Sequence, residues 1–127
     1  MKLFREWKAA ALFGRGAGKF YRQDYAAAAR SLRSALTLDP NMNHVWQTLS
    51  LLGRCHLALG ESEESLRVLQ KAYDALPDDR STIRRGFLEQ EMLRTLKAFS
   101  DALLAVGQPD RAKEILHEVK EERLRRK

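Results

Sequence analysis

The strongest constraint on the fold is a pattern of small and large apolar residues that recurs along the chain. When Gly16 is aligned with Gly53, 37 positions later, the surrounding residues also match in kind. The other pairs at the same 37-residue step are Leu12 and Leu49, Ala28 and Ser65, Leu32 and Leu69, Ala35 and Ala72, and Pro40 and Pro77. A third copy lies 47 positions after the second, with Leu96, Ser100, Gly107, Ala112, Leu116 and Val119. Repetition of this kind is typical of folds that stack one supersecondary unit.

Each copy has the pattern of two helices joined by a short turn. Apolar residues recur every three or four positions, and the sustained alternation typical of strands is absent. Pro40 and Pro77 end helices, because the residue before a proline disfavours helical geometry. Gly60 and Gly107 stand where a left-handed cap would follow a helix. The sequence therefore predicts an all-α chain of six or seven helices in antiparallel hairpins, forming a single domain of residues 1–127.

These residues resemble the tetratricopeptide-repeat family, whose unit is two antiparallel helices in about 34 residues. The second copy fits the family pattern best, with Leu49, Leu52, Gly53, Gly60, Ser65, Leu69, Ala72 and Pro77. The first copy departs from it at Arg15, Lys19 and Gln23, and the third lacks the final proline. The resemblance implies a right-handed superhelix that acts as a non-catalytic interaction module. The repeats that it implies cover about residues 9–42, 46–79 and 93–126.

The interval between the second and third copies is longer than one repeat, through the segment DRSTIRRGFLEQEML. Such an insertion, over about residues 80–92, either extends the first helix of the third copy or adds a short helix. Ile83, Phe87, Leu88 and Met92 recur at helical spacing. This spacing favours one long helix that is weakened at Gly86.

The segment GRGAGK at residues 14–19 has the composition of a phosphate-binding loop but not its pattern. A P-loop needs a glycine five positions before the Gly-Lys pair and a hydroxyl residue after it, and these positions hold Phe13 and Phe20. The sequence also predicts no strand before the segment, although phosphate loops and dinucleotide-binding motifs both require one. The repeat alignment instead places Gly16 where the two helices of a hairpin approach closely. We therefore expect a packing role.

No group of residues has the spacing of a catalytic, metal or cofactor site. His44, His56 and His117 are scattered, and the adjacent Cys55 and His56 point about 100° apart on a helix, which is unsuitable for sharing an ion. We expect Cys55 to be a buried structural thiol, and the chain to be no enzyme and to hold no cofactor or metal. A single cysteine, together with the lack of a long apolar run, favours a cytoplasmic protein.

The resemblance implies that a peptide or helix of a partner binds in a concave groove lined by the first helices of the repeats. The groove positions carried across from the family are Phe13, Ala17, Tyr21, Gln47, Ser50, Arg54, Arg94, Lys97 and Asp101. They run from apolar to basic. Phe13 and Tyr21 would hold an apolar anchor, while the arginines and the lysine would pair with carboxylates. In the alternative, Phe13 packs against the N-terminal helix and fills its own end of the groove.

The N-terminal segment suggests an alternative function. Leu3, Phe4 and Trp7, continued by Ala10 and Ala11, form an apolar stripe beside basic residues. Such a helix can pack on the first repeat, join two copies, or lie on a membrane surface, and we favour the first two. The alternative is therefore a self-associating assembly module, or, by analogy of fold, a small chaperone for a secreted or assembled protein.

The net charge of +6 is divided between two basic ends and an acidic middle, so no uniform basic stripe for nucleic acid is present. The segment KEERLRRK alternates acids with bases and has no aromatic residues to stack on bases, so we expect a solvated cap. The expected partner is a protein or peptide with apolar and acidic residues, with a homo-oligomer as the alternative. We expect neither nucleic acid nor a membrane as partner.

Overall fold

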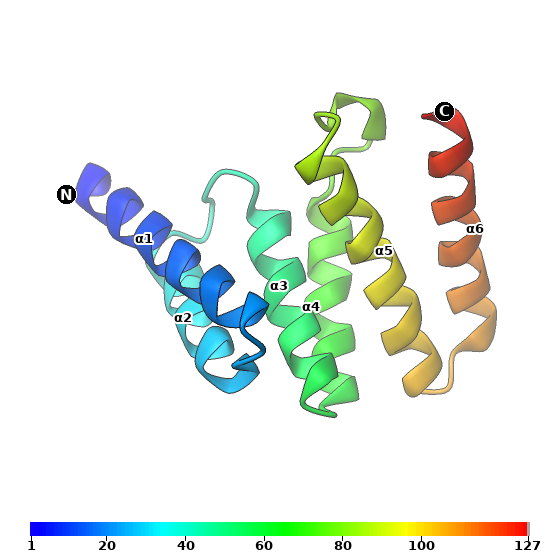
Figure 1. Ribbon diagram of the computed structural model, residues 1–127, viewed down its shortest axis with the longest axis horizontal. Helices are drawn as coiled ribbons and strands as arrows, with labels where there is room; N and C mark the ends of the chain where they lie inside the picture. Colours follow the sequence, from blue (N-terminus) through cyan, green and yellow to red (C-terminus); the bar gives the residue numbers. More distant parts are fainter. Residues whose placement is uncertain (127) are drawn as a thin grey trace.

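The computed structural model describes residues 1–126 and has, in that part of the chain, six α-helices, one short 3-10 helix and no strand. The helices stack side by side along the long axis of the molecule, with the two ends of the chain at opposite ends of the stack (Figure 1). Their bounds are α1 Lys2–Tyr21, α2 Tyr25–Leu38, α3 Val45–Ala58, α4 Ser62–Ala75, α5 Phe87–Ala105 and α6 Pro109–Arg125, with the 3-10 helix η1 at Arg80–Thr82. The predicted all-α hairpin architecture is confirmed.

In the first two hairpins, a glycine allows close approach of the two helices. A Cβ atom on Gly16 would lie 2.8 Å from Leu32 Cγ, and one on Gly53 would lie 2.5 Å from Leu69 Cγ. Carbon atoms do not pack so closely, so any larger residue would force the helices apart. The packing role predicted for Gly16 is confirmed. By contrast, a Cβ on Gly14 would have no neighbour within 4 Å, so packing within this chain does not require that glycine.

The third hairpin replaces the glycine with a serine and links its helices through a hydroxyl group. Ser100 of α5 donates to the carbonyl oxygen of Ala112 in α6 at 3.2 Å. In the second hairpin the direction is reversed, since Ser65 of α4 donates to the carbonyl oxygen of Gly53 in α3 at 2.7 Å. Both hydroxyls are buried and both have partners, as buried polar groups require.

The three turns within the hairpins share one backbone conformation. Gln23, Gly60 and Gly107 occupy equivalent positions and have φ angles of 65°, 78° and 83°. Glycine adopts this left-handed geometry without steric cost, whereas glutamine adopts it with strain. Asp24 partly compensates, because its carboxylate accepts from the backbone N–H of Ala27 at 3.4 Å and caps α2.

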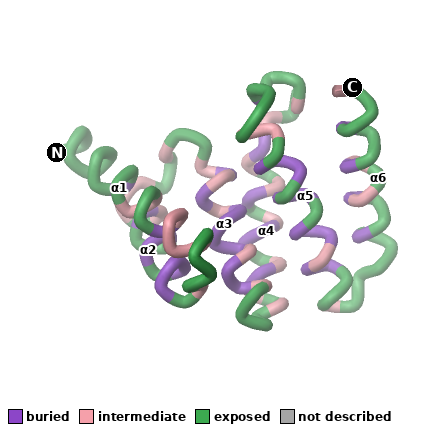
Figure 2. The backbone as a smooth tube through the Cα atoms, viewed as in Figure 1, coloured by how far each residue is buried: buried purple, intermediate pink, exposed green. Residues whose placement is uncertain are grey.

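The core runs between the layers of helices (Figure 2). Each second helix packs on its own first helix and on the next one, so α2 contacts α1 and α3, and α4 contacts α3 and α5. One buried cluster centres on Leu32, Leu51 and Cys55, and the other on Leu69 and Phe99. The first helices also touch one another, since α3 contacts both α1 and α5. This arrangement leaves one side of α1, α3 and α5 without a covering helix.

The long helix that we expected over residues 80–92 is wrong for its first part. The segment after α4 forms only the 3-10 helix η1, and α5 begins at Phe87. Gly86 has φ 102° and ψ −129°, a conformation that no helix contains, so it separates the two elements. Ile83 has helical spacing with α5, but it is buried in the second core cluster from the irregular segment.

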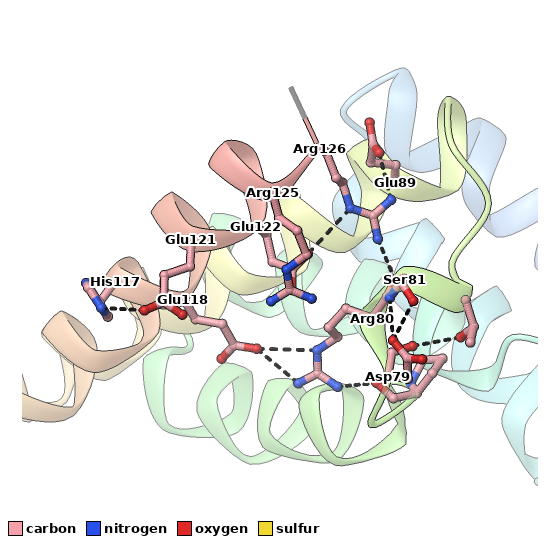
Figure 3. Close-up of polar contacts among 12 residues, drawn as sticks. Asp79, Arg80, Ser81, Glu89, His117, Glu118, Glu121, Glu122, Arg125 and Arg126 are labelled. Atoms are coloured by element: carbon pink, nitrogen blue, oxygen red, sulfur yellow. Dashed lines mark hydrogen bonds and ion pairs between the residues drawn. The ribbon is translucent and has the colours of Figure 1, made fainter.

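The end of α6 holds this irregular segment in place. Arg126 forms an ion pair with Glu89 at 2.7 Å (Figure 3). It also donates to the backbone carbonyl oxygens of Arg80 and Ile83. Arg80 in turn pairs with Glu118 at 3.1 Å. Because the Arg126 side chain is only 10% exposed, the expectation that the C-terminal segment is merely a solvated cap is wrong for this residue.

Candidate functional site

The uncovered side of α1, α3 and α5 carries most of the predicted groove residues, and we call it the first-helix face. Tyr21, Arg94 and Lys97 are exposed there, and Phe13, Ala17, Gln47, Arg54 and Asp101 are half-buried. Ser50 is the exception, because it is fully buried. Its hydroxyl lies 2.6 Å from that of Thr95, which donates to the backbone oxygen of Glu91. Ser50 therefore joins α3 to α5 and does not face a ligand.

A buried carboxylate links the three first helices. The side chain of Glu91, near the start of α5, is 1% exposed and lies beneath the first-helix face. Its Oε1 atom accepts from the Tyr21 hydroxyl of α1 at 2.6 Å. Its Oε2 atom accepts from Arg54 of α3 at 2.7 Å, and Arg94 approaches Oε1 at 3.4 Å. We call these four residues the Glu91 cluster.

The Glu91 cluster changes the pKa of Tyr21 and holds the Arg54 side chain in place. Burial, followed by the hydrogen bond to Glu91, raises the pKa of Tyr21 to about 12, so its hydroxyl stays protonated and donates. The guanidinium of Arg54 also lies 4.8 Å over the ring of Phe20. Arg54 is thus held by contacts within the chain. Arg94 differs, because its side chain is 53% exposed and keeps donors free for another group.

Sequence reasoning did not identify Glu91, because no repeat position specifies it. The one local signal is its spacing: Glu91 lies four and seven residues before Thr95 and Ala98, which are both buried. A carboxylate on the apolar side of a helix needs a counterion. Its two strongest partners, however, lie 70 and 37 residues away in sequence.

A cavity of about 640 Å³ opens at the end of the first-helix face near α1. Phe13 forms part of its wall, together with Ala10 of α1 and Gln47 of α3. The rest is lined by Lys2, Glu6, Thr48, and residues 39 and 41–44 of the α2–α3 loop. Phe13 also packs against the first core cluster. It therefore serves as a wall of the cavity and leaves the space beside it open.

A shallower depression of about 330 Å³ lies at the α5 end of the same face. Four of the predicted groove residues line it, namely Arg54, Arg94, Lys97 and Asp101. Its wall is completed by Gln90, Leu93, Ala98 and Arg123. Arg123 comes from α6, and no repeat pattern points to it. Lys97 pairs with Asp101 at 2.6 Å, and their side chains are 59% and 41% exposed. Four cations thus meet one lining carboxylate, so the depression is basic.

The other residues that the sequence singled out lie apart from this face. Cys55 is buried, and burial raises the pKa of its thiol to about 11, which confirms the predicted structural thiol. His56 accepts from Arg33 and lies 2.8 Å from Glu61, on the side of α3 that faces α2. His117 pairs with Glu121 at the surface of α6. Within residues 1–126, no three histidine, cysteine or acidic side chains cluster as metal ligands would.

The N-terminal stripe does not pack on the rest of the chain. It belongs to α1, which is itself the first helix of the first hairpin. Leu3, Phe4 and Trp7 are 80%, 60% and 68% exposed. Of the two favoured interpretations, packing on the first repeat is therefore wrong for these side chains. Contact between copies stays a prediction.

Comparison with known proteins supports the repeat architecture. The tetratricopeptide-repeat sequence model matches residues 20–85, which run from the end of α1 through α2, α3 and α4. A search of curated proteins found no match. In the part of the chain that the structure describes, no helix has both the length and the apolar character needed to cross a bilayer.

Proposed function

Because the chain belongs to the tetratricopeptide-repeat family, whose members generally mediate protein–protein interaction, we propose that it binds a peptide or helix of a partner protein along the first-helix face. The observation that carries the proposal is the change of character along this face. The cavity near α1 has Phe13 as an apolar wall, whereas the depression at α5 is basic. A ligand with an apolar anchor followed by acidic residues matches both ends.

The cavity near α1, whose lining is polar except for Ala10, Phe13 and Met42, supplies most of the affinity through its apolar wall. An aromatic or aliphatic anchor that enters the cavity buries apolar surface against Phe13 and Ala10, and such anchors dominate binding energies. The exposed cations at the other end contribute about 1 kcal/mol or less each, because water and salt screen them. Their role is to set the orientation of the ligand and to select for acidic residues.

The Glu91 cluster changes which cations are available. Arg54 already pairs with Glu91, and turning it toward a ligand would leave that buried carboxylate with only the Tyr21 hydroxyl and the more distant Arg94 as partners. Arg94 and Lys97 have the exposure to reach a ligand, and Arg123 lines the same depression. A carboxylate of the ligand would replace Asp101 as the partner of Lys97, an exchange between two exposed ion pairs that costs little.

The proposal is tested by peptide-display selection against the wild-type chain and against Lys97→Glu/Arg123→Glu. Neither of these residues touches Glu91, so the fold should persist, and circular dichroism checks this. The matched control is Lys71→Glu/Lys113→Glu, which changes the net charge equally at exposed sites on α4 and α6. We expect an apolar-acidic motif that binds the wild type and the control but not the test variant. Equal binding to all three proteins, or loss in the control as well, would contradict the groove.

A further inference from the structure

The two interior first helices are each covered on one side by the second helix of the preceding repeat. In α3 the covered positions are Thr48, Leu51, Leu52, Cys55 and His56, all buried. In α5 the equivalent positions, 47 residues later, are Thr95, Ala98, Phe99, Ala102 and Leu103, and these are buried too. The covering elements are α2 for α3 and α4 for α5.

The same side of α1 has no covering helix. The equivalent positions, 37 residues before those of α3, are Ala11, Gly14, Arg15, Gly18 and Lys19. The first three are exposed and the last two half-buried. Helical spacing continues this side through Phe4 and Trp7, whose side chains are 60% and 68% exposed. These seven residues form what we call the outer α1 face, at the N-terminal end of the stack (Figures 1 and 2).

We propose that the outer α1 face binds an acidic amphipathic helix of a partner protein, packed against α1 as α2 packs against α3. The internal repeats provide the precedent, since the equivalent side of both other first helices is covered by a helix. This surface is distinct from the first-helix face, so both can be occupied at once.

The outer α1 face has room for the large apolar side chains of such a helix. A Cβ on Gly14 would meet nothing within 4 Å, and one on Gly18 would meet only the end of the Arg22 side chain at 3.7 Å. Glycine destabilises a helix interior relative to alanine, and packing within this chain does not require it at either position. The equivalent positions of α3, Leu51 and Cys55, lie buried beneath α2, so glycine at both positions of α1 leaves more space for the side chains of an incoming helix. Phe4 and Trp7 extend the contact with aromatic surface.

Charge selects the kind of helix. Arg15 and Lys19 stand where α3 has Leu52 and His56, and Lys8 lies two turns before Arg15 on the same flank. Among residues 1–126, no carboxylate lies within ion-pair distance of Arg15 or Lys19. Acidic residues on the incoming helix would pair with these cations.

The same charges disfavour a second copy of this chain. Two outer α1 faces in contact would bring their basic flanks together. Stacking of α6 from one copy on α1 of another is also disfavoured. The apolar side chains that α4 packs on α5 include Leu66 and Tyr73, and the equivalent residues of α6 are Lys113 and Lys120. That side of α6 is polar and, like α1, basic.

The exposed indole of Trp7 allows a direct test. The probe is a stapled peptide with the sequence of residues 61–77, which contains α4, covers the equivalent side of α5 and carries four acidic and two basic residues. Excitation of tryptophan alone should show a saturable blue shift as Trp7 is buried. The shift should be missing in Trp7→Phe, whose remaining Trp46 is already buried. A peptide with its acidic residues changed to lysine should bind about tenfold more weakly or worse.

Variants separate this surface from the first-helix face. Arg15→Glu/Lys19→Glu should weaken peptide binding by about tenfold or more, and circular dichroism checks that the fold persists. The first-helix variant Lys97→Glu/Arg123→Glu should bind the peptide as the wild type does. No blue shift at any peptide concentration would overturn the proposal. It would also be overturned by a shift that rises with protein concentration alone, which means self-association. A shift with phosphatidylserine vesicles but not with the peptide would overturn it as well.

Discussion

Removing Arg54 should destabilise the fold through the buried carboxylate that it neutralises. Glu91 is 1% exposed and Arg54 is 14% exposed, and the two are joined at 2.7 Å. Breaking a buried ion pair by deleting one partner costs about 3–5 kcal/mol, because the remaining charge is left uncompensated. Here the Tyr21 hydroxyl and the more distant Arg94 remain on Glu91. We therefore expect Arg54→Met to lower the free energy of unfolding by about 2–3 kcal/mol.

The origin of this loss can be isolated with a double-mutant cycle. Methionine keeps most of the apolar stem of Arg54, but it removes both the charge that pairs with Glu91 and the guanidinium over the Phe20 ring, and the double variant lacks the guanidinium contact as well. Adding Glu91→Leu removes the buried carboxylate, and we expect the double variant to return to within about 1 kcal/mol of the wild type. Urea unfolding followed by circular dichroism at the helix band measures all four free energies. A fall in midpoint temperature of about 10 °C should accompany the single change.

Two results would show that Arg54 does not stabilise the fold by neutralising Glu91. The first is an Arg54→Met variant whose stability lies within about 0.5 kcal/mol of the wild type, which would mean that Glu91 is not dependent on Arg54. The second is a double variant as unstable as Arg54→Met, which would place the loss in packing instead of charge. The cycle also bears on the choice of binding variants, since a charge reversal at Arg54 would confuse lost binding with lost folding.

Further predictions follow from backbone geometry and burial. Gly53→Ala should lower the free energy of unfolding by about 1–3 kcal/mol, because its Cβ would lie 2.5 Å from a leucine side chain. Gly14→Ala should instead raise it by about 1 kcal/mol. Urea unfolding measures both changes. Gln23→Gly should stabilise by about 1 kcal/mol in the same assay by relieving a φ of 65°. Burial raises the pKa of the Cys55 thiol to about 11, so the thiol stays neutral in the folded protein. The contribution of the buried thiol to the free energy of unfolding is therefore fully present below pH 9 and is lost as the pH rises toward 11. The stability difference between wild type and Cys55→Ala should narrow by about 3 kcal/mol over that range.

The parts of the fold that the sequence predicts are those set by short-range spacing. Gly16 is assigned to a close helix contact because it aligns with Gly53 at the 37-residue step of the repeat, and both glycines make such a contact. The sequence predicts the left-handed turn at Gly60 and Gly107, and the turn also forms at Gln23, where repetition of the fold outweighs residue preference.

The parts that the sequence does not predict depend on contacts between distant residues. Spacing alone extends α5 back to Ile83, but the geometry of Gly86 and the burial of Ile83 end it at Phe87. The Glu91 cluster unites three helices, so no local pattern contains it. The role of Arg126 depends in the same way on an irregular segment whose position is set by the rest of the chain.

Binding along the first-helix face is tested most directly by locating a bound peptide on the protein. A peptide obtained by display selection is titrated into isotopically labelled protein, and the shifts of the backbone amide resonances are followed by nuclear magnetic resonance. We expect shifts along the first-helix face of α1, α3 and α5 and in residues 39 and 41–44, with the outer surfaces of α4 and α6 unchanged. Shifts confined to α4 and α6, with none around Phe13 and Lys97, would contradict binding along this face.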